Sequence, residues 1–463
     1  MTEPDLSTLH LDAALLPGGW ADDVRVDIAD GRIVALETDV APRADAERVA
    51  IALPGLPNLH SHGFQRGMAG LTEYRGPDAD NFWSWRTLMY RFVERMTPED
   101  LEAVTAWAFV EMLESGFTRV GEFHYVHHDP AGKPYANPAE LTERVVSAAH
   151  ETGIALTLLP VFYAHGGFGA APPAAGQKRF VLDVPGFARL LEAGRALAMR
   201  LPHAIVGVAP HSLRAVTPME LGQVVSFAGP GPVHIHAAEQ LGEVEQCVAW
   251  SGARPVDWLL DHAPIDSRWC LVHATHMTET EISRLAASGA VAGLCPVTEA
   301  NLGDGISEAS RFIAAGGAFG IGTDSNVRID AAEELRLLEY SQRLRDRARN
   351  VIADRSMSEG RGRSTGRVLF DGALRGGSRA LGALMAGPAG IEVGAPADIV
   401  SLDAASPSLM ERRADALLDS FVFAGAGIDG VWRAGVKVVA GGRHVARERL
   451  EARYRKVLAR LIA

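Results

Sequence analysis

The sequence predicts an α/β fold: a (β/α)8 barrel of the TIM type with a small β-sandwich domain built from both chain termini. Eight short apolar runs alternate with longer amphipathic segments between residues 54 and 385, which is the pattern of eight β/α units. Both ends of the chain instead have the alternating pattern of half-buried strands. The length of 463 residues exceeds the roughly 250–300 residues at which a single core stops growing.

The two ends of the chain are expected to share the small β domain. In residues 1–53, the segment DVRVDIADGRIVALE alternates apolar and polar residues around Asp30-Gly31, a dipeptide typical of hairpin turns. Residues 386–463 continue the pattern in PADIVSLD and VWRAGVKVVAGGRHV. Arg, Leu and Val at helical spacing predict a terminal helix over 446–462.

Residues 54–385 are predicted to form the barrel. Each apolar run is hydrophobic on both faces, as buried parallel strands are. The runs are LPGLPNLHSH, FTRVGEFHY, IALTLLPVFYA, AIVGVAPHS, PVHIHAAE, WCLVHATH, AVAGLCPVTEAN and AFGIGTDSN. Segments such as PEDLEAVTAWAFVEMLES lie between them and have helical periodicity. The polar residues that end these strands converge at one mouth of the barrel, where the active site is expected.

Two long connections interrupt this regular pattern. Residues 63–97, which include Phe82-Trp83-Ser84-Trp85, are expected to fold over the mouth of the barrel. Residues 356–367, with the sequence SMSEGRGRSTGR, are expected to form a mobile loop.

Composition excludes several classes of function. The net charge of −12 without a basic stripe argues against nucleic acid as a partner. An anionic small substrate remains compatible, because one or two buried arginines override the overall field locally. No secretion signal and no apolar stretch of membrane-spanning length is recognisable, and the three cysteines are too scattered for a disulfide framework. A cytoplasmic protein without membrane association is expected.

Histidines and one aspartate at predicted strand ends indicate a metal site. His60 and His62 close the first strand, where alternation points both imidazoles to the same side. His236 ends the fifth strand and Asp324 the eighth. Three imidazoles and one carboxylate suit Zn²⁺, with a coordination position left open for catalysis. One divalent metal ion is therefore expected, with Zn²⁺ preferred over the Fe²⁺ or Mn²⁺ that the same ligands accept.

Two further strand-end residues complete a candidate hydrolytic centre. A bound ion lowers the pKa of water toward ~7. Asp324 can both bind the ion and accept the proton of this water. Glu239, three residues after His236, is placed to carry a proton to a substrate nitrogen, and His273 ends the sixth strand, where it can steady a tetrahedral intermediate. The sequence thus predicts a metal-dependent hydrolase.

These residues resemble the amidohydrolase superfamily, and the resemblance covers the whole chain, including GAPADIVSLD near the return to the small domain. The His-x-x-Glu of the fifth strand is similar to that of the deaminase branch, which includes adenosine and guanine deaminases. Two-metal branches use a bridging carboxylated lysine, usually on the fourth strand. The fourth strand here, AIVGVAPHS, offers His211 and no lysine, which favours one ion over two.

Within that superfamily, the chain resembles the N-formimino-L-glutamate deiminases of histidine degradation. The matching segments are LPNLHSHGFQRGMAGLTE, NFWSWRTLMYRF, EFHYVHH, APHSLRAVTP, HIHAAEQ, WCLVHATHM, GLCPVTEANLGDG and EELRLLEYSQRLRDRARN. The resemblance implies hydrolysis of a formimino C=N bond, with N-formyl-L-glutamate and ammonia as products. It also implies a homodimer.

A dicarboxylate substrate calls for arginine, which binds carboxylates bidentately. Arg86 on the 63–97 connection and Arg214 after the fourth strand are the candidates. Tyr125, after the second strand, can donate a further hydrogen bond, and Gln65 is placed to contact the formimino nitrogen. His211 stands beside Arg214 at the mouth. The family resemblance, rather than spacing, assigns these five residues to substrate binding.

Three other interpretations are open at this stage. A deaminase of another amidine, such as a guanine- or adenosine-like heterocycle, would need an aromatic platform and few cations at the mouth. A two-metal amidase or lactonase would bind close to two ions. A decayed barrel without activity would lack ligands, whereas the full set is present in this sequence.

Overall fold

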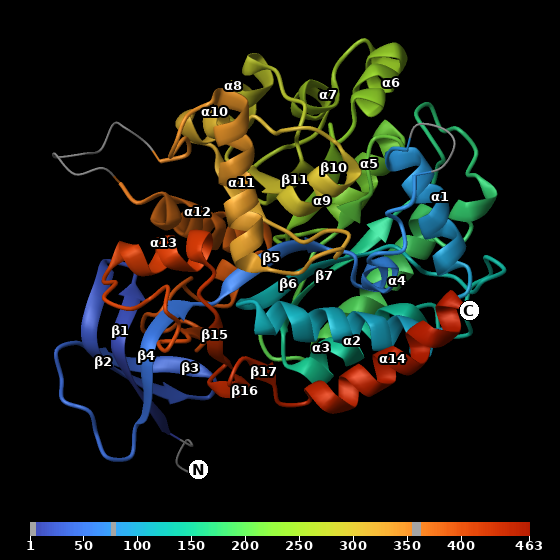
Figure 1. Ribbon diagram of the computed structural model, residues 1–463. Coiled ribbons are helices and arrows are strands. Elements are labelled where there is room, and N and C mark those ends of the chain that lie inside the picture. The colour runs from blue at the N-terminus through green and yellow to red at the C-terminus, as the bar shows by residue number, and fades with distance from the viewer. Residues whose placement is uncertain (1–5, 76–79, 354–362) are drawn as a thin grey trace.

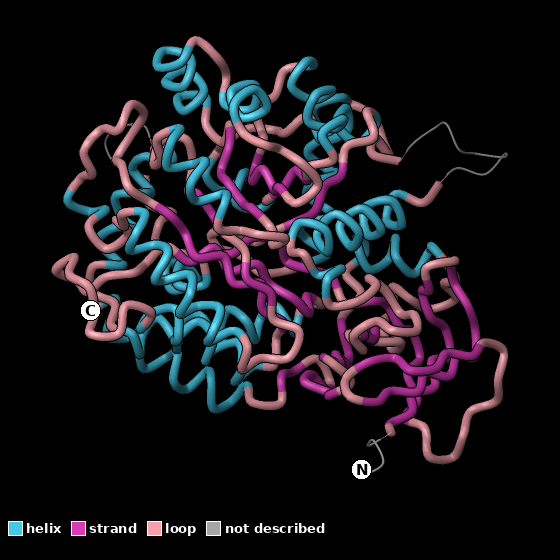
Figure 2. Tube along the Cα trace, turned by 180° about the vertical axis from the view of Figure 1, so that it is seen from behind, coloured by secondary structure: helices cyan, strands magenta, loops and turns pink. Residues whose placement is uncertain are grey.

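The computed structural model of the protein describes residues 6–75, 80–353 and 363–463. Residues 356–362 of the expected loop therefore lie outside the described residues. Figure 1 shows a small sheet made from the two ends of the chain beside a larger body of strands and helices. In the view from behind, the strands of this larger body lie inside and the helices outside (Figure 2).

The first and last strands of the chain form one eight-stranded sheet. Its strands are β1 (Ser7–Leu16), β2 (Gly19–Ala29), β3 (Arg32–Glu37), β4 (Glu47–Pro54), β14 (Ile399–Leu402), β15 (Ile428–Arg433), β16 (Val436–Ala440) and β17 (Arg443–His444). The order β17-β16-β15-β14-β4-β1-β2-β3 joins the two ends of the chain through the antiparallel pair β4 and β14. Because the sheet also has its own apolar core, the predicted small β domain is confirmed.

The β2–β3 hairpin turns at Asp30-Gly31, as the sequence predicts. Ala29 pairs with Arg32, and the two residues between them have φ values of 50° and 75°. Positive φ at both central positions matches the twist of the flanking strands. A side chain at Gly31 would also lie 3.1 Å from the Ala434 Cβ, so glycine serves both the turn and the packing.

In the described part of the chain, eight parallel strands form the barrel. They are β5 (Leu56–Ser61), β6 (Phe117–His124), β7 (Ala155–Phe162), β8 (Ile205–Val206) continued by β9 (Ala209–Pro210), β10 (Val233–Ala237), β11 (Trp269–His273), β12 (Val291–Leu294) and β13 (Ala318–Ile321). β5 to β8 pair in chain order, and so do β10 to β13. Parallel bridges from Val208 to Val233 and from Ser61 to Asp324 join the two sets. The barrel is thereby closed, which confirms the predicted fold class.

Two strands are shorter than the apolar runs predict. The fourth is interrupted at Gly207, where a Cβ would lie 2.4 Å from the Pro232 carbonyl oxygen. The run AVAGLCPVTEAN ends as a strand at Leu294, and the helix α9 (Pro296–Leu302) follows. Proline donates no ladder hydrogen bond but fits the first turn of a helix, which explains the early end of the seventh strand.

Helices cover the outside of the barrel. They are α2 (Pro98–Glu114), α3 (Glu140–Thr152), α4 (Val184–Ala198), α5 (Pro218–Ser226), α6 (Leu241–Ser251), α7 (Pro255–His262), α8 (Glu279–Ser288), α10 (Ala309–Ala314), α11 (Ala331–Asp346) and α12 (Thr365–Ala380). Thr97, Thr217 and Thr278 begin three of them through reciprocal capping boxes. The predicted terminal helix is confirmed as α14 (Arg447–Ile462), which packs on α2 (Figure 1).

The connection after β5 contains the 3₁₀ turn η1 (Gly63–Met68) and the helix α1 (Phe82–Val93). Asn81 caps α1, because its side chain accepts the Trp83 N–H.

The remaining short elements are η2 (Ala175–Gln177), η3 (Ala383–Met385) and α13 (Asp415–Ala424). Among the described helices, none is long and apolar enough to cross a membrane.

Acid is expected to destabilise the protein through His124, at the buried end of β6. Burial lowers the pKa of this imidazole to about 3, whereas an unfolded histidine titrates near ~6.5. At a pH between these two values, the unfolded chain binds one more proton than the folded protein. The free energy of unfolding is therefore fully retained above pH ~6.5 and decreases below it, by about 1.4 kcal/mol per pH unit. In thermal unfolding scans, the difference in midpoint temperature between wild type and His124→Gln should become smaller as the pH is lowered from 7 to 5. A difference that stays constant would show that protonation of His124 does not cause the loss of stability.

Candidate functional site

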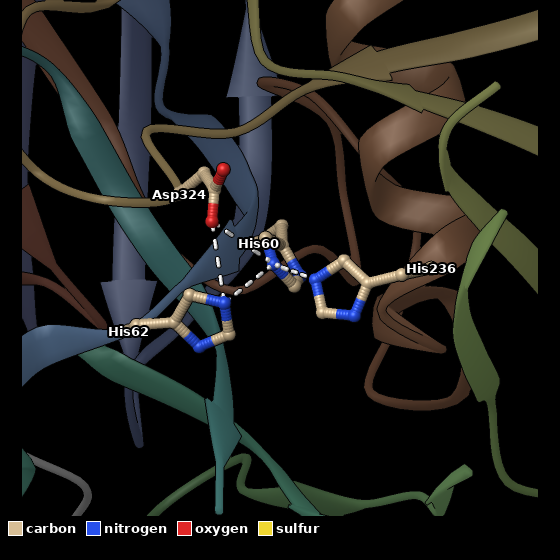
Figure 3. A group of neighbouring side chains, drawn as sticks. All are labelled: His60, His62, His236 and Asp324. Carbon is tan, nitrogen blue, oxygen red and sulfur yellow. Dashed lines mark hydrogen bonds and ion pairs between the residues drawn. The ribbon is translucent and has the colours of Figure 1, made fainter. Parts of the chain in front are cut away.

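Four side chains from three barrel strand ends meet at the mouth (Figure 3). His60 Nε2 lies 3.2 Å from His62 Nε2 and 3.1 Å from His236 Nε2. The Asp324 carboxylate lies 3.4 Å from His60 and 3.2 Å from His62. All four are buried, and their donor atoms lie within 4.8 Å of one another. The structure therefore brings together the four residues that the sequence singles out.

Backbone carbonyls orient two of these imidazoles. His62 Nδ1 donates to the Phe123 carbonyl and His236 Nδ1 to the His211 carbonyl, each over 3.0 Å. Because a carbonyl oxygen only accepts, Nδ1 carries the proton and Nε2 presents its lone pair to the cluster. This is the tautomer that a metal ion requires.

The electrostatics of the cluster fit a divalent cation. Burial lowers the pKa of His60 to about 3 and holds that of His236 well below its usual value. Burial alone would raise the pKa of Asp324, but the adjacent His60 and His62 side chains hold it well below the usual range. Neutral nitrogens and one carboxylate at such short separations repel unless a cation lies between them. The donor set is the one expected of a zinc site.

Glu239 and His273 lie beside this cluster. The Glu239 carboxylate is 3.7 Å from His273 Nε2, which is 3.8 Å from the Asp324 carboxylate. Burial raises the pKa of Glu239, although His273 opposes the shift. Burial would lower the pKa of His273, but Glu239 and a hydrogen bond with Glu299 raise it to about 10. A carboxyl group with a raised pKa thus faces an imidazole whose pKa is also raised, so the two form a buried acid–base pair beside the cluster.

The backbone is strained at these strand ends. His273 has a φ of 70°, Asp324 of 44° and Ala238, just before Glu239, of 53°. Positive φ costs a residue with a side chain on the order of 1 kcal/mol or more and persists where neighbouring contacts enforce it. At Ala238 the enforcing group is buried Glu243, whose carboxylate accepts the Ala238 and Glu239 N–H groups over 3.3 and 3.1 Å. These two hydrogen bonds fix the backbone before Glu239 and thereby the direction of the Glu239 side chain.

Glu299 is a site residue that spacing does not identify. Its carboxylate lies 3.3 Å from His273 Nδ1 and accepts the Cys295 N–H over 2.9 Å. Glu299 belongs to α9, but the sequence pattern assigns this segment to a strand. The direction of the Glu299 side chain therefore cannot be predicted from the sequence pattern. The short strand before Pro296 is the signal that would reveal it, because a helix there turns Glu299 back toward the mouth.

His62, His236 and Asp324 of the cluster line a pocket with a volume of about 650 Å³, which includes the open space at its mouth. All five residues proposed to bind substrate line it: Gln65, Arg86, Tyr125, His211 and Arg214. Glu239 and His273 line it as well. Phe82, Trp85, Met89 and Tyr90 of α1 form part of its wall, so the connection after β5 lies at the mouth as expected.

The two arginines approach the same aromatic surface. Arg86 stands over the Trp83 ring at 4.5 Å, and Arg214 lies 5.7 Å from that ring. Arg214 is 7% exposed, and in the described part of the chain its Nε and Nη1 have no hydrogen-bond partner. Buried guanidinium nitrogens without a partner are costly, which indicates that a ligand satisfies them.

Gln65 and Tyr125 lie on the side of the pocket nearest the histidines. Gln65 Nε2 donates to the Tyr125 hydroxyl over 2.7 Å, and the Tyr125 ring is 4.9 Å from the His62 ring. Gln65 Oε1 is buried without a partner among the described residues. An acceptor held next to the cluster suits an N–H group of a substrate.

The sequence matches two family models. Residues 51–438 match the amidohydrolase family, and residues 6–50 match the N-terminal domain of formimidoylglutamate deiminase HutF. The chain is 49% identical to the formimidoylglutamate deiminase of Pseudomonas aeruginosa, with 99% of this chain and 100% of that protein covered.

Solved structures show the same architecture. An amidohydrolase from Brucella melitensis is 55% identical, with a TM-score of 0.94 over 99% of this chain and 100% of that one. An adenosine deaminase from Xanthomonas campestris, solved with bound zinc, is 22% identical, with a TM-score of 0.78 over 98% of each chain. The second likeness concerns the fold alone.

Proposed function

Since this chain belongs to the amidohydrolase family, we propose that it hydrolyses the formimino C=N bond of N-formimino-L-glutamate. The products are N-formyl-L-glutamate and ammonia, and the reaction belongs to histidine degradation. The relative from Pseudomonas aeruginosa and the match to the N-terminal domain support this activity.

Four residues are proposed to hold one divalent ion, with Zn²⁺ preferred: His60, His62, His236 and Asp324. Their mutual distances, their burial and the inward lone pairs of His62 and His236 support this assignment. When bound, such an ion lowers the pKa of water toward ~7 and polarises the reacting C=N group.

The surrounding side chains then move the protons. Asp324 accepts a proton from the attacking water, and Glu239 delivers a proton to the formimino nitrogen. The water oxygen bonds to the formimino carbon, which turns the C=N double bond into a single bond. Both protons of the water pass to the nitrogen by way of Asp324 and Glu239, so the nitrogen leaves as ammonia when the C–N bond breaks and the formyl C=O bond forms. His273, charged and 3.7 Å from Glu239, stabilises negative charge that develops on the oxygen.

The substrate carboxylates are proposed to bind Arg86 and Arg214. The main support for this assignment is buried Arg214, whose Nε and Nη1 have no hydrogen-bond partner among the described residues. The pocket joins these cations to the metal cluster, as a molecule with carboxylates at one end and an amidine at the other requires. Gln65, Tyr125 and His211 complete the binding surface.

Ammonia release from N-formimino-L-glutamate, measured beside guanine and adenosine, tests the proposed function. We expect turnover of the first compound to exceed that of both heterocycles by orders of magnitude. Turnover of a heterocycle without turnover of N-formimino-L-glutamate would assign the chain to another deaminase.

Arg86→Met is expected to raise KM for N-formimino-L-glutamate by about tenfold or more and to change kcat little. A charge-assisted hydrogen bond to a carboxylate contributes about 1.5–3 kcal/mol, and Arg86 is proposed to bind a carboxylate rather than the formimino group that reacts. Steady-state kinetics beside Arg91→Met, on the exposed face of the same helix, provides the check. An unchanged KM would remove Arg86 from the site.

We also propose, from the family resemblance and the composition, that the enzyme acts in the cytoplasm as a homodimer. Its partner is the small dicarboxylate substrate, with no role for nucleic acid or membranes.

A further inference from the structure

Tyr163 follows β7 directly and has no role in the mechanism above. It is 6% exposed and lines the same pocket as the two arginines. Its ring meets the His211 ring edge-on at 4.6 Å. A phenol placed among charged groups at the wall of a binding pocket is a candidate for contact with the ligand.

A neighbouring amide controls the direction of the Tyr163 hydroxyl. Gln177 Oε1 accepts the Ala174 N–H over 2.7 Å, which fixes the orientation of the amide. Gln177 Nε2 therefore faces the phenol and donates to its oxygen over 2.6 Å. In the described part of the chain the Tyr163 hydroxyl makes no other hydrogen bond, so its own hydrogen is free to donate into the pocket.

The pocket contains a second phenol held in the same way. Tyr125 accepts from Gln65 over 2.7 Å and lies beside His62, near the metal cluster. Tyr163 lies closer to His211, at 4.6 Å between ring centroids against 6.0 Å for Tyr125, and the charges of Arg214 and Arg86 act on it. Tyr125 is thus the phenol nearer the metal cluster, and Tyr163 is the phenol on which the two arginines act.

Burial keeps the Tyr163 hydroxyl protonated, so that it can donate a hydrogen bond. Burial raises the pKa of its hydroxyl well above the usual value, and the two arginines only partly oppose this shift. A hydroxyl that accepts one hydrogen bond also donates a stronger second one. Its natural acceptor at this end of the pocket is an anion bound to the arginines.

We propose that Tyr163, oriented by Gln177, donates a hydrogen bond to a substrate carboxylate and contributes to selection of a dicarboxylate. This inference rests on the proposed function, because that function places carboxylates next to Arg86 and Arg214. A site built to hydrogen-bond a group also discriminates strongly against ligands that lack it, since its own polar atoms are then left unpaired.

Tyr163→Phe tests the proposal by removing one oxygen atom. We expect the Kd for the reaction product N-formyl-L-glutamate, measured by calorimetry on the metal-loaded enzyme, to rise by about tenfold or more. KM for N-formimino-L-glutamate should rise in parallel while kcat changes little. Tyr454→Phe is the matched control, because Tyr454 stacks on Trp107 of α2, away from the pocket, and it should bind as wild type does.

Product analogues that lack one carboxylate show whether the lost bond is to a carboxylate. N-formyl-γ-aminobutyrate lacks the α-carboxylate, and N-formyl-norvaline lacks the side-chain carboxylate. The effect of Tyr163→Phe should disappear for one of the two and persist for the other. Equal weakening for both analogues, or no weakening for N-formyl-L-glutamate, would overturn the proposal.

Gln177→Met supplies a second test that leaves Tyr163 intact. We expect weaker product binding than in wild type, and little further weakening when Gln177→Met is added to Tyr163→Phe, because both changes act through one hydrogen bond. Additive losses would overturn the orienting role. Failure of the proposed function is distinguishable, since wild type would then release no ammonia from N-formimino-L-glutamate.

Discussion

Glu239→Gln is expected to lower kcat by about a thousandfold while the metal content stays at the wild-type value. Proton transfer by a positioned side chain contributes roughly 10²–10⁴-fold to a rate, and glutamine cannot deliver the proton. Glu239 lies outside the group of four proposed ligands but 3.7 Å from His273 and 4.0 Å from Arg214. Metal retention with lost turnover is therefore the specific signature of this role.

Steady-state assays of ammonia release, combined with elemental analysis of the same preparations, measure this outcome. Glu245→Gln is the matched control, since Glu245 is exposed on α6, which begins two residues after Glu239. It should retain wild-type kcat. Wild-type kcat in Glu239→Gln would refute the role of Glu239 as proton carrier, and loss of the metal would show that it contributes to the ion site instead.

Removal of the metal should also lower the activity strongly. After treatment with a chelator, activity should fall more than about hundredfold, because water near neutral pH is then no longer activated. One equivalent of Zn²⁺ per chain should restore it. The midpoint of thermal unfolding should rise on addition of Zn²⁺, because binding to the folded state alone stabilises that state.

The stoichiometry at full recovery separates one ion from two. Titration of the stripped enzyme with Zn²⁺ should reach full activity at one equivalent, in line with a fourth strand that has no lysine at its end. His236→Ala is the matched variant and should recover little activity under the same titration. Recovery that requires two equivalents would support a two-metal hydrolase, and activity that survives complete metal removal would exclude the proposed chemistry.

Local patterns account for what could be predicted. His60 and His62 share one side of a strand because side chains alternate along it, and parallel barrel strands end at the same mouth. Placing His236, His273 and Asp324 at strand ends was therefore enough to predict that they meet. The Asp30-Gly31 turn and the terminal helix follow from equally local signals.

Local patterns could not predict residues whose roles depend on contacts between distant segments of the chain. Glu299 reaches His273 across 26 positions of the chain, and it does so because Pro296 ends β12 early and begins α9. Gln177 reaches Tyr163 from a short 3₁₀ turn without a repeating pattern of its own. Sequence periodicity carries no information on either contact.

The sequence by itself determined the barrel, the small domain shared by both ends, and the strand-end residues of the metal cluster, because these follow from periods of two and 3.6 residues. Only the tertiary structure decided how the chemistry is supported. It placed Arg86 and Arg214 over one aromatic surface, Glu243 under the strained backbone of Glu239, and Gln177 against Tyr163. Those arrangements arise where segments that follow different strands meet, and the relative positions of these segments are set by tertiary packing rather than by local sequence.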